Sequence, residues 1–259
     1  MPWYSKRASR SWTRRLAWVF LALGPVFSSG GAPSALAADH AVVLMYHRFG
    51  ETELSSTNIG IEAFEAHIRE LKEGGYTVWP ISRIVDAVRN RRPLPERTVG
   101  LTVDDAYASV FANAWPRIKA AGLPFTLFVS TDPVDKDQAG FMTWDQIREL
   151  ARNGVEIGAH TASHLHMVDG GRALGRAELA RSTDRFVIEI GKKPTLFAYP
   201  YGETSSAIRR LVKEWDYGAA FGQQSGVVNP TSDFHYLPRF ALNERYGRIQ
   251  RFRRVLRTL

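Results

Sequence analysis

Two adjacent carboxylates, Asp104 and Asp105, have the clearest potential for chemistry in this 259-residue chain. They follow the run 98–103, whose β-branched and apolar residues predict a buried strand, and a helical spacing of apolar residues follows over 110–121. The pair therefore begins a strand-to-helix loop, where α/β sheets and barrels collect their active sites. Adjacent acids repel each other unless a cation or a shared proton relieves the repulsion. An exposed acidic turn that caps the next helix is the alternative.

His160 and His164 form a second candidate site. They lie four residues apart after 155–159, a run that predicts another strand. If their loop takes a helical turn, the two imidazoles can converge on one ion, to which Asp105 adds a carboxylate oxygen. This ligand set suits zinc or another first-row divalent metal and leaves coordination positions open for water and substrate. A solvated histidine-rich turn is the alternative, but both elements fall at predicted strand ends, which favours one shared site.

Strands and helices alternate through the rest of the chain. Apolar or β-branched runs predict strands over 41–46, 76–79, 98–103, 124–130, 155–159, 195–199, 218–221 and 236–242. Apolar residues at helical spacing predict helices over 61–71, 81–88, 110–121, 144–151, 173–190 and 206–215. The alternation predicts an α/β fold of mostly parallel strands, with a barrel as the best closure.

The first 37 residues have the composition of a secretory signal peptide. Basic residues precede the apolar stretch 16–27, and Ala35-Leu36-Ala37 supplies a small-residue cleavage signal. This stretch is short for a bilayer span, although an uncleaved membrane anchor is the alternative. We expect a signal peptide over 1–37, a single domain over 38–259, and a periplasmic or extracellular protein.

Composition narrows the range of partners. The formal net charge is +8, but five of the 34 basic residues and none of the 26 acids fall within 1–37. Residues 38–259 therefore carry only +3, and nothing indicates a nucleic acid partner. The chain has no cysteine, which excludes disulfides and thiolate chemistry and is compatible with export. Residues 249–259 predict an amphipathic basic helix that covers the core, with a peripheral membrane or envelope contact as the alternative.

Three motifs occur in an order that resembles a known family. They are Thr102-Val103-Asp104-Asp105, His160-Thr161-Ala162-Ser163-His164 and Tyr199-Pro200-Tyr201-Gly202. With the strand pattern from about Val42 to about Leu242, they resemble the polysaccharide deacetylases, the NodB-homology or carbohydrate esterase 4 family. The resemblance implies a distorted (β/α) barrel with a metal-dependent deacetylase site.

The resemblance also implies a role for each motif residue. By position, Asp104 is the general base, and the metal ligands are Asp105, His160 and His164. The backbone of Tyr201 contributes to the oxyanion site. The family implies one divalent metal ion, for which zinc is our first choice. Such an ion polarises an amide carbonyl and lowers the pKa of water, while the base takes the proton.

Three positions depart from the family pattern. Ala106 replaces the glycine of the aspartate loop, and Ala198 replaces the arginine that commonly orients the base. Arg239 stands in the late motif that usually supplies the general acid histidine, a pattern that resembles the exopolysaccharide-modifying branch. We predict that the Arg239 guanidinium reaches Asp104 and orients it, with a solvent-facing Arg239 as the alternative.

Other side chains are candidates for supporting roles. His47 or His235 could protonate the leaving amine, and His166 is a weaker candidate for the metal, although each could equally be structural. Trp144 and Tyr199 offer aromatic faces to sugar rings, and with His47 they form the predicted substrate-binding set.

Together these features predict a secreted, metal-dependent deacetylase of N-acetylated sugars in a surface or secreted polysaccharide. An O-acetyl esterase is the close alternative, since the same metal site can attack both bonds. A catalytically silent carbohydrate-binding protein on the same fold is the alternative from another class. The changes at Ala198 and Arg239 favour it, whereas retention of Asp104 with all three ligands favours an enzyme.

Overall fold

The structure, a computed structural model, describes residues 37–259. The predicted signal peptide lies outside these residues apart from Ala37, so cleavage after Ala37 stays a prediction. Within the described part of the chain, no helix has both the length and the apolar composition needed to cross a membrane.

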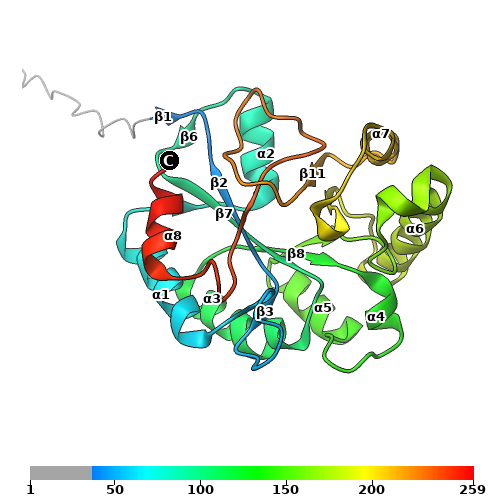
Figure 1. Ribbon diagram of the computed structural model, residues 1–259, viewed down its shortest axis with the longest axis horizontal. Helices are drawn as coiled ribbons and strands as arrows, with labels where there is room; N and C mark the ends of the chain where they lie inside the picture. The colour runs from blue at the N-terminus through cyan, green and yellow to red at the C-terminus, as the bar shows by residue number, and fades with distance from the viewer. Residues whose placement is uncertain (1–36) are drawn as a thin grey trace, which may run out of the picture. The chain divides into compact units, whose positions relative to one another are not determined.

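A curled sheet of eight strands lies at the centre of the fold (Figure 1). The hydrogen-bonded order is β11-β10-β9-β8-β7-β2-β12, β5 pairs with the start of β7, and every pairing is parallel, as predicted. The strands are β2 (Val42–Tyr46), β5 (Thr77–Val78), β7 (Thr98–Asp104), β8 (Thr126–Val129), β9 (Glu156–Ala159), β10 (Leu196–Ala198), β11 (Ala219–Phe221) and β12 (Phe240–Ala241).

An irregular segment, 234–239, continues the sheet toward a barrel. Backbone hydrogen bonds from Ala220 and Gly222 hold this segment beside β11, and the chain then enters β12, which pairs with β2. Much of the predicted strand 236–242 is therefore irregular, in part because Pro238 has no N–H to donate to a strand ladder. The predicted distorted barrel is confirmed.

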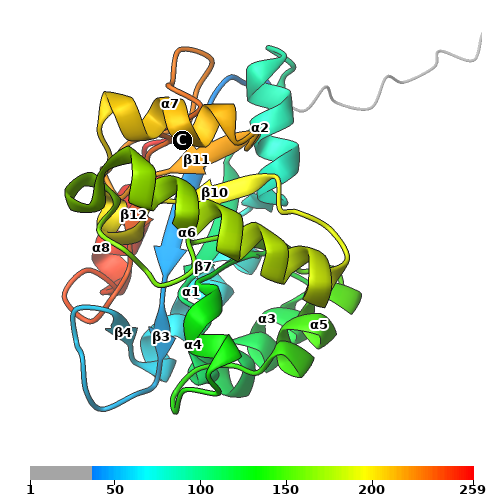
Figure 2. The same ribbon diagram turned by 90° about the vertical axis from the view of Figure 1, so that its right-hand side faces the viewer.

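Helices follow most of the strands and pack around the sheet (Figure 2). They are α1 (Ile61–Glu73), α2 (Ile81–Arg89), α3 (Trp115–Ala121), α4 (Thr131–Asp135), α5 (Trp144–Arg152), α6 (Met167–Ile190), α7 (Ser206–Glu214) and α8 (Ile249–Leu256). The short turns and strands are β1 (Ala37–Ala38), β3 (Arg48–Phe49), β4 (Asn58–Ile59), β6 (Leu94–Pro95), the π-helical turn η1 (Val110–Ala114) and the 3₁₀ turn η2 (Pro200–Gly202). All predicted helices are present, although α6 begins earlier than the predicted residue 173.

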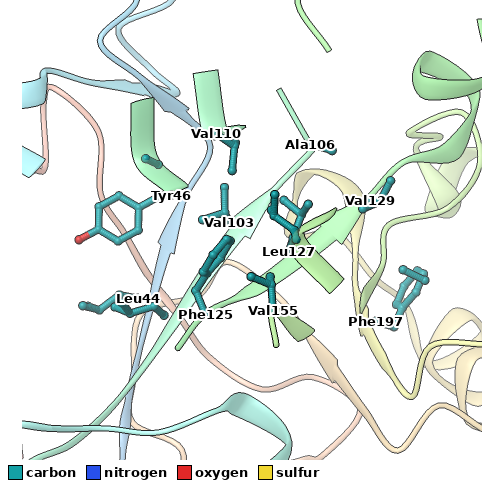
Figure 3. Packing of buried hydrophobic residues seen from close by; sticks show 14 of the residues in the cluster. Leu44, Tyr46, Val103, Ala106, Val110, Phe125, Leu127, Val129, Val155 and Phe197 are labelled. Carbon is teal, nitrogen blue, oxygen red and sulfur yellow. The ribbon is translucent and has the colours of Figure 1, made fainter. Parts of the chain in front are cut away.

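The two faces of strands such as β2 and β8 bury separate hydrophobic clusters. Leu44 of β2 belongs to the larger cluster, part of which Figure 3 shows, whereas Val43 belongs to an inner cluster that includes Phe128 and Phe221. The apolar face of α2 also joins the inner cluster. Gly100 permits this packing, because a Cβ atom there would lie 2.4 Å from Ile81 Cδ1. The carboxyl ends of the strands, opposite α2, are left to carry polar side chains.

His67 ties α1 to β2 and α8. Its ring is fully buried, and its Nε2 lies 2.7 Å from the carbonyl oxygen of Gly247, which can only accept a hydrogen bond. Nε2 therefore carries the proton, and Nδ1 accepts from the Tyr46 hydroxyl at 3.0 Å. Phe252 of α8 stacks on the ring at 3.8 Å. The apolar side of α8 thus covers the core, as predicted for this basic helix.

This buried imidazole predicts a loss of stability in acid. Burial lowers the pKa of His67 from 6.5 to about 4, against the opposing effect of the Gly247 carbonyl. His67 therefore binds a proton at a higher pH in the unfolded chain than in the folded one. Its contribution to stability is fully present above about pH 6.5 and is lost as the pH falls toward 4. We expect the free energy of unfolding, measured in urea, to fall between about pH 7 and about pH 5 by roughly 2 kcal/mol more in the wild type than in His67→Gln. Equal losses would contradict this assignment.

Candidate active site

Asp104 and Asp105 lie where β7 ends. Asp104 is the last residue of the strand, and the chain then takes left-handed backbone angles at Asp105 (φ 76°) and Ala106 (φ 59°). This explains the glycine that the family pattern has at position 106, because a Cβ atom in this conformation costs about 1–2 kcal/mol. Both carboxylates are buried, as a cation-binding or catalytic pair would be, rather than exposed as in a solvated turn.

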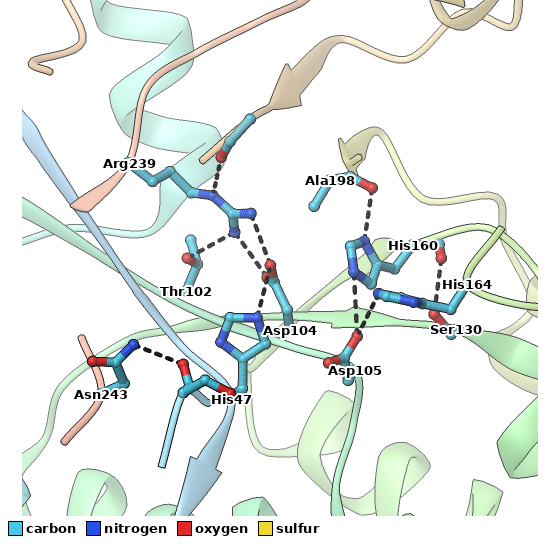
Figure 4. A network of polar contacts seen from close by, with 12 residues as sticks. His47, Thr102, Asp104, Asp105, Ser130, His160, His164, Ala198, Arg239 and Asn243 are labelled. Carbon is cyan, nitrogen blue, oxygen red and sulfur yellow. Dashed lines mark hydrogen bonds and ion pairs between the residues drawn. The ribbon is translucent and has the colours of Figure 1, made fainter. Parts of the chain in front are cut away.

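The predicted metal ligands converge on one point. Nε2 of His160 and Nε2 of His164 each lie 3.3 Å from Oδ1 of Asp105 (Figure 4). One ligand atom from each residue lies within 4.8 Å of the other two. His160 follows β9, and its Nδ1 donates to the carbonyl of Ala198 at the end of β10, at 2.7 Å. That bond holds the ring so that Nε2 faces Asp105.

This cluster fits a divalent cation. Because Nδ1 of His160 donates to a carbonyl, Nε2 is the nitrogen that presents a lone pair toward the carboxylate whenever the ring is neutral. Oδ1 of Asp105 is buried and has no hydrogen-bond partner within residues 37–259. An acceptor oxygen that faces imidazole nitrogens at 3.3 Å is satisfied by a shared cation, and this donor set suits zinc.

The charges in the cluster also favour a cation. Burial alone would raise the pKa of Asp105, but the positive charge that a protonated His160 places beside it outweighs burial, so the pKa is lowered and the carboxylate stays ionised. A bound cation would take the place of that proton. Burial opposes protonation of His160, yet the nearby carboxylates raise its pKa. Burial and the neighbouring His160 lower the pKa of His164 to about 4, which leaves that ring neutral at physiological pH.

Arg239 holds Asp104 in a two-pronged contact, as predicted. Its two terminal nitrogens lie 2.8 Å from Oδ1 and 2.8 Å from Oδ2 of the carboxylate, and both side chains are fully buried. Burial alone would raise the pKa of Asp104, but the charge of Arg239 outweighs it, so the pKa is lowered. The arginine is itself fixed by the carbonyl of Gly222 and the hydroxyl of Thr102.

The structure separates the two candidate proton donors. Nε2 of His47, which follows β2, lies 4.0 Å from Oδ2 of Asp104, and the side chain is 13% exposed. His235 instead bonds the carbonyl of Tyr217 through Nε2. Only His47 of these two histidines contacts the site.

Tyr201 lies beside the metal ligands on the turn η2. Its φ of 58° is left-handed, and its backbone N–H has no hydrogen-bond acceptor in the described part of the chain. The half-exposed ring packs edge-on against His164 at 4.5 Å and stacks on His166 at 3.5 Å. His166 is outside the ligand cluster and contacts Glu203 at 3.2 Å.

The prediction that Tyr199 and Trp144 bind substrate is wrong. Tyr199 is fully buried, and its hydroxyl donates to the carbonyl of His235 at 2.9 Å. Trp144 is 8% exposed, packs edge-on against Phe186, and donates its indole N–H to Asp135 at 2.7 Å. Both rings fill the core, so neither offers a face to a sugar. His47 is the one member of that predicted set that lies at the site.

Sequence reasoning missed the residues that hold the histidine loop. Ser130, after β8, donates its hydroxyl to the carbonyl of His160 at 2.8 Å. Glu178 of α6 accepts hydrogen bonds from the backbone of the loop. The available signal for Glu178 was its position on the apolar side of a helix, beside Leu179, where an unpaired acid would be costly.

Comparisons with known proteins agree with these motifs. Residues 91–220, about half of the chain, match a family model described as polysaccharide deacetylase. The Bacillus subtilis protein YxkH, whose name assigns it to the polysaccharide deacetylases, is 25% identical over 198 residues, 76% of this chain and 69% of that protein. The poly-beta-1,6-N-acetyl-D-glucosamine N-deacetylase of Escherichia coli (strain K12) is 28% identical over 211 residues, covering 65% of this chain but only 31% of that enzyme.

The fold also matches a solved structure. The deacetylase PplD of Streptococcus pyogenes, in complex with acetate, superposes with a TM-score of 0.78 at 18% sequence identity. The match covers 85% of this chain and 99% of that one. The distorted barrel is therefore shared over nearly its whole length.

Proposed function

Because this chain belongs to the polysaccharide deacetylase family of hydrolases, we propose that it removes acetyl groups from N-acetylated sugars of a cell-surface or secreted polysaccharide, with a divalent metal ion, most readily zinc. The observation that carries this proposal is one cluster: Asp105, His160 and His164 converge beside Asp104, which Arg239 holds in place. An accompanying proposal, which rests on the sequence of residues 1–37 alone, is that the protein is exported.

The metal ligands and Asp104 have different roles in the proposed reaction. When a cation is bound at the cluster, it supplies polarisation of the scissile carbonyl and a water of lowered pKa. Asp104 is ionised and buried, so it can take a proton from the attacking water. Arg239 fixes both carboxylate oxygens, which limits the base to one orientation.

Two further groups complete the reaction. The free N–H of Tyr201 can donate to the oxyanion that develops as water attacks the amide. The leaving amine needs a proton, because an amide ion is a very poor leaving group. His47, 4.0 Å from Asp104, is positioned to deliver it.

The substrate follows from a relative rather than from the site. The Escherichia coli relative is named for poly-beta-1,6-N-acetyl-D-glucosamine, and an N-acetylglucosamine exopolysaccharide is accordingly the first substrate to test.

The catalytically silent alternative is disfavoured by the Arg239 contact, because a protein that only bound sugar would not need an oriented, buried base.

Acetate release tests the proposed function. The protein is stripped with a chelator, reloaded with Zn²⁺ or another divalent ion, and supplied with N-acetylglucosamine oligomers and with O-acetylated glycans. We expect release from the N-acetylated oligomers that depends on added metal. Release from O-acetylated glycans alone would establish an esterase instead. No release from any glycan by the metal-loaded protein would support the silent alternative.

His47→Gln tests the proton donor. We expect its turnover on N-acetylated oligomers to fall by about 10²–10⁴-fold, with metal content retained. Turnover of the same variant on an aryl acetate ester should fall much less, because the phenolate leaving group needs little protonation. His235→Gln is the matched control and should match the wild type on both substrates. Equal losses of His47→Gln on the two substrates would contradict the role of His47 as the donor.

A further inference from the structure

The loop that carries both histidine ligands has an unfavourable backbone. Thr161 and His164 are not glycines, yet both have left-handed angles, with φ of 65° and 58°. Such residues persist only where the surrounding structure holds them. The loop therefore depends on contacts made by its neighbours.

One side of the loop is held by Ser130 after β8 and by the first turn of α4. Ser130 donates its hydroxyl to the carbonyl of His160 at 2.8 Å, and the backbone N–H of Asp132 donates to the carbonyl of Ala162 at 2.8 Å. These contacts satisfy carbonyl groups of the loop. They leave its N–H groups to be satisfied from the other side.

Glu178 holds that other side. Its Oε2 accepts from the N–H of Ala162 at 3.1 Å and from the N–H of Ser163 at 2.7 Å, between the two left-handed residues. The side chain is 3% exposed, so its charge lies out of water. A buried carboxylate that accepts two backbone N–H groups makes strong, charge-assisted hydrogen bonds. It is therefore a rigid support for this stretch of backbone.

Arg181 joins the two supports. It lies one turn beyond Glu178 on α6, with its guanidinium 3.6 Å from Oε1 of that residue. It also binds both carboxylate oxygens of Asp132, at 2.6 Å each. Residues on both sides of the histidine loop are thus linked through Arg181, where α4 and α6 are in contact. The two helices can be followed in Figure 1.

We propose that Glu178 is a positioning residue of the metal site, which sets metal affinity by holding the loop so that His160 and His164 face Asp105. The inference rests on the proposed function, since it requires the cluster to bind a metal. If Glu178 served only to fasten α6 to the barrel, its loss would lower the stability of the fold but not the affinity of the correctly folded protein for metal.

Zinc affinity tests the proposal. In the full-length protein, the Kd for Zn²⁺ is measured by competition with a chromophoric chelator, and thermal unfolding is followed with and without Zn²⁺. We expect Glu178→Gln, which keeps the shape but loses the charge, to raise the Kd by about 10–100-fold, the usual effect of losing a group that supports metal ligands. The stabilisation that Zn²⁺ gives should shrink correspondingly.

Ser182→Ala is the matched control. Ser182 lies one turn further along α6, is equally buried, and its hydroxyl has no hydrogen-bond partner within residues 37–259. We expect its Kd to equal that of the wild type. If Glu178→Gln does not fold, Glu178→Asp replaces it, since the shorter side chain keeps the charge but cannot reach both N–H groups.

The outcomes separate this inference from the proposed function. A folded Glu178 variant with wild-type zinc affinity, whatever its melting temperature, would overturn the positioning role and leave the deacetylase proposal intact. A wild-type protein without affinity for Zn²⁺ or other divalent ions would overturn the metal-dependent function itself.

Discussion

Asp105→Asn is expected to remove most of the bound metal, whereas Asp104→Asn should keep the metal and reduce turnover by about 10²–10⁴-fold. The reason lies in the partners of the two carboxylates. Asp105 faces His160 and His164, and no arginine within residues 37–259 pairs with it, so its charge is available to a cation. Asp104 is turned toward Arg239, which occupies both of its oxygens.

Metal content by mass spectrometry and turnover by acetate release check this difference. Each variant is first compared with the wild type by circular dichroism, because Asp104→Asn leaves the buried guanidinium of Arg239 facing a neutral amide. Equal metal loss in the two variants would mean that the aspartates form one ligand unit and that the base lies elsewhere. Full turnover in Asp104→Asn would remove it from the mechanism.

Parts of the site that depend on local sequence could be predicted. Asp104, Asp105 and His160 each follow a run of strand-forming residues, and parallel strands bring their carboxyl ends to one edge of the sheet. The alternation of strands and helices likewise predicted that the strands of the barrel are parallel. Arg239 could be predicted because the base needed an orienting group and Ala198 could not provide one.

Parts that depend on packing could not. Tyr199 follows a strand and begins a motif, where a ring can turn toward the substrate or toward the core, and only the packing of the neighbouring elements decides between them. Ala198 contributes a backbone carbonyl to His160, which no side-chain pattern reveals. Glu178 reaches the histidine loop from α6 across the fold, and sequence spacing does not specify such a contact.

Arg239 should be as important to turnover as the base that it holds. Arg239→Lys keeps the positive charge but cannot bind both oxygens of Asp104, and we expect turnover to fall by about 10²-fold, the effect of a small misplacement of a reacting group. In Arg239→Ala, turnover should fall further. This variant should also lose about 3–5 kcal/mol of stability, because it leaves a buried carboxylate unpaired. Metal content should stay near that of the wild type in both, since Arg239 contacts none of the three ligands.

The pH profile and a double-mutant cycle distinguish this role from a merely structural one. Arg239 lowers the pKa of Asp104, so without it burial raises that pKa, and the acid limb of turnover should move to higher pH in Arg239→Ala. If Arg239 acts through Asp104, then Arg239→Lys should reduce turnover much less in an Asp104→Asn background than in the wild type. Equal losses in the two backgrounds, with an unmoved acid limb, would mean that Arg239 only fills the barrel above Phe128 and Phe221. Asp104 would then be a base without an orienting partner, which would favour the silent carbohydrate-binding alternative.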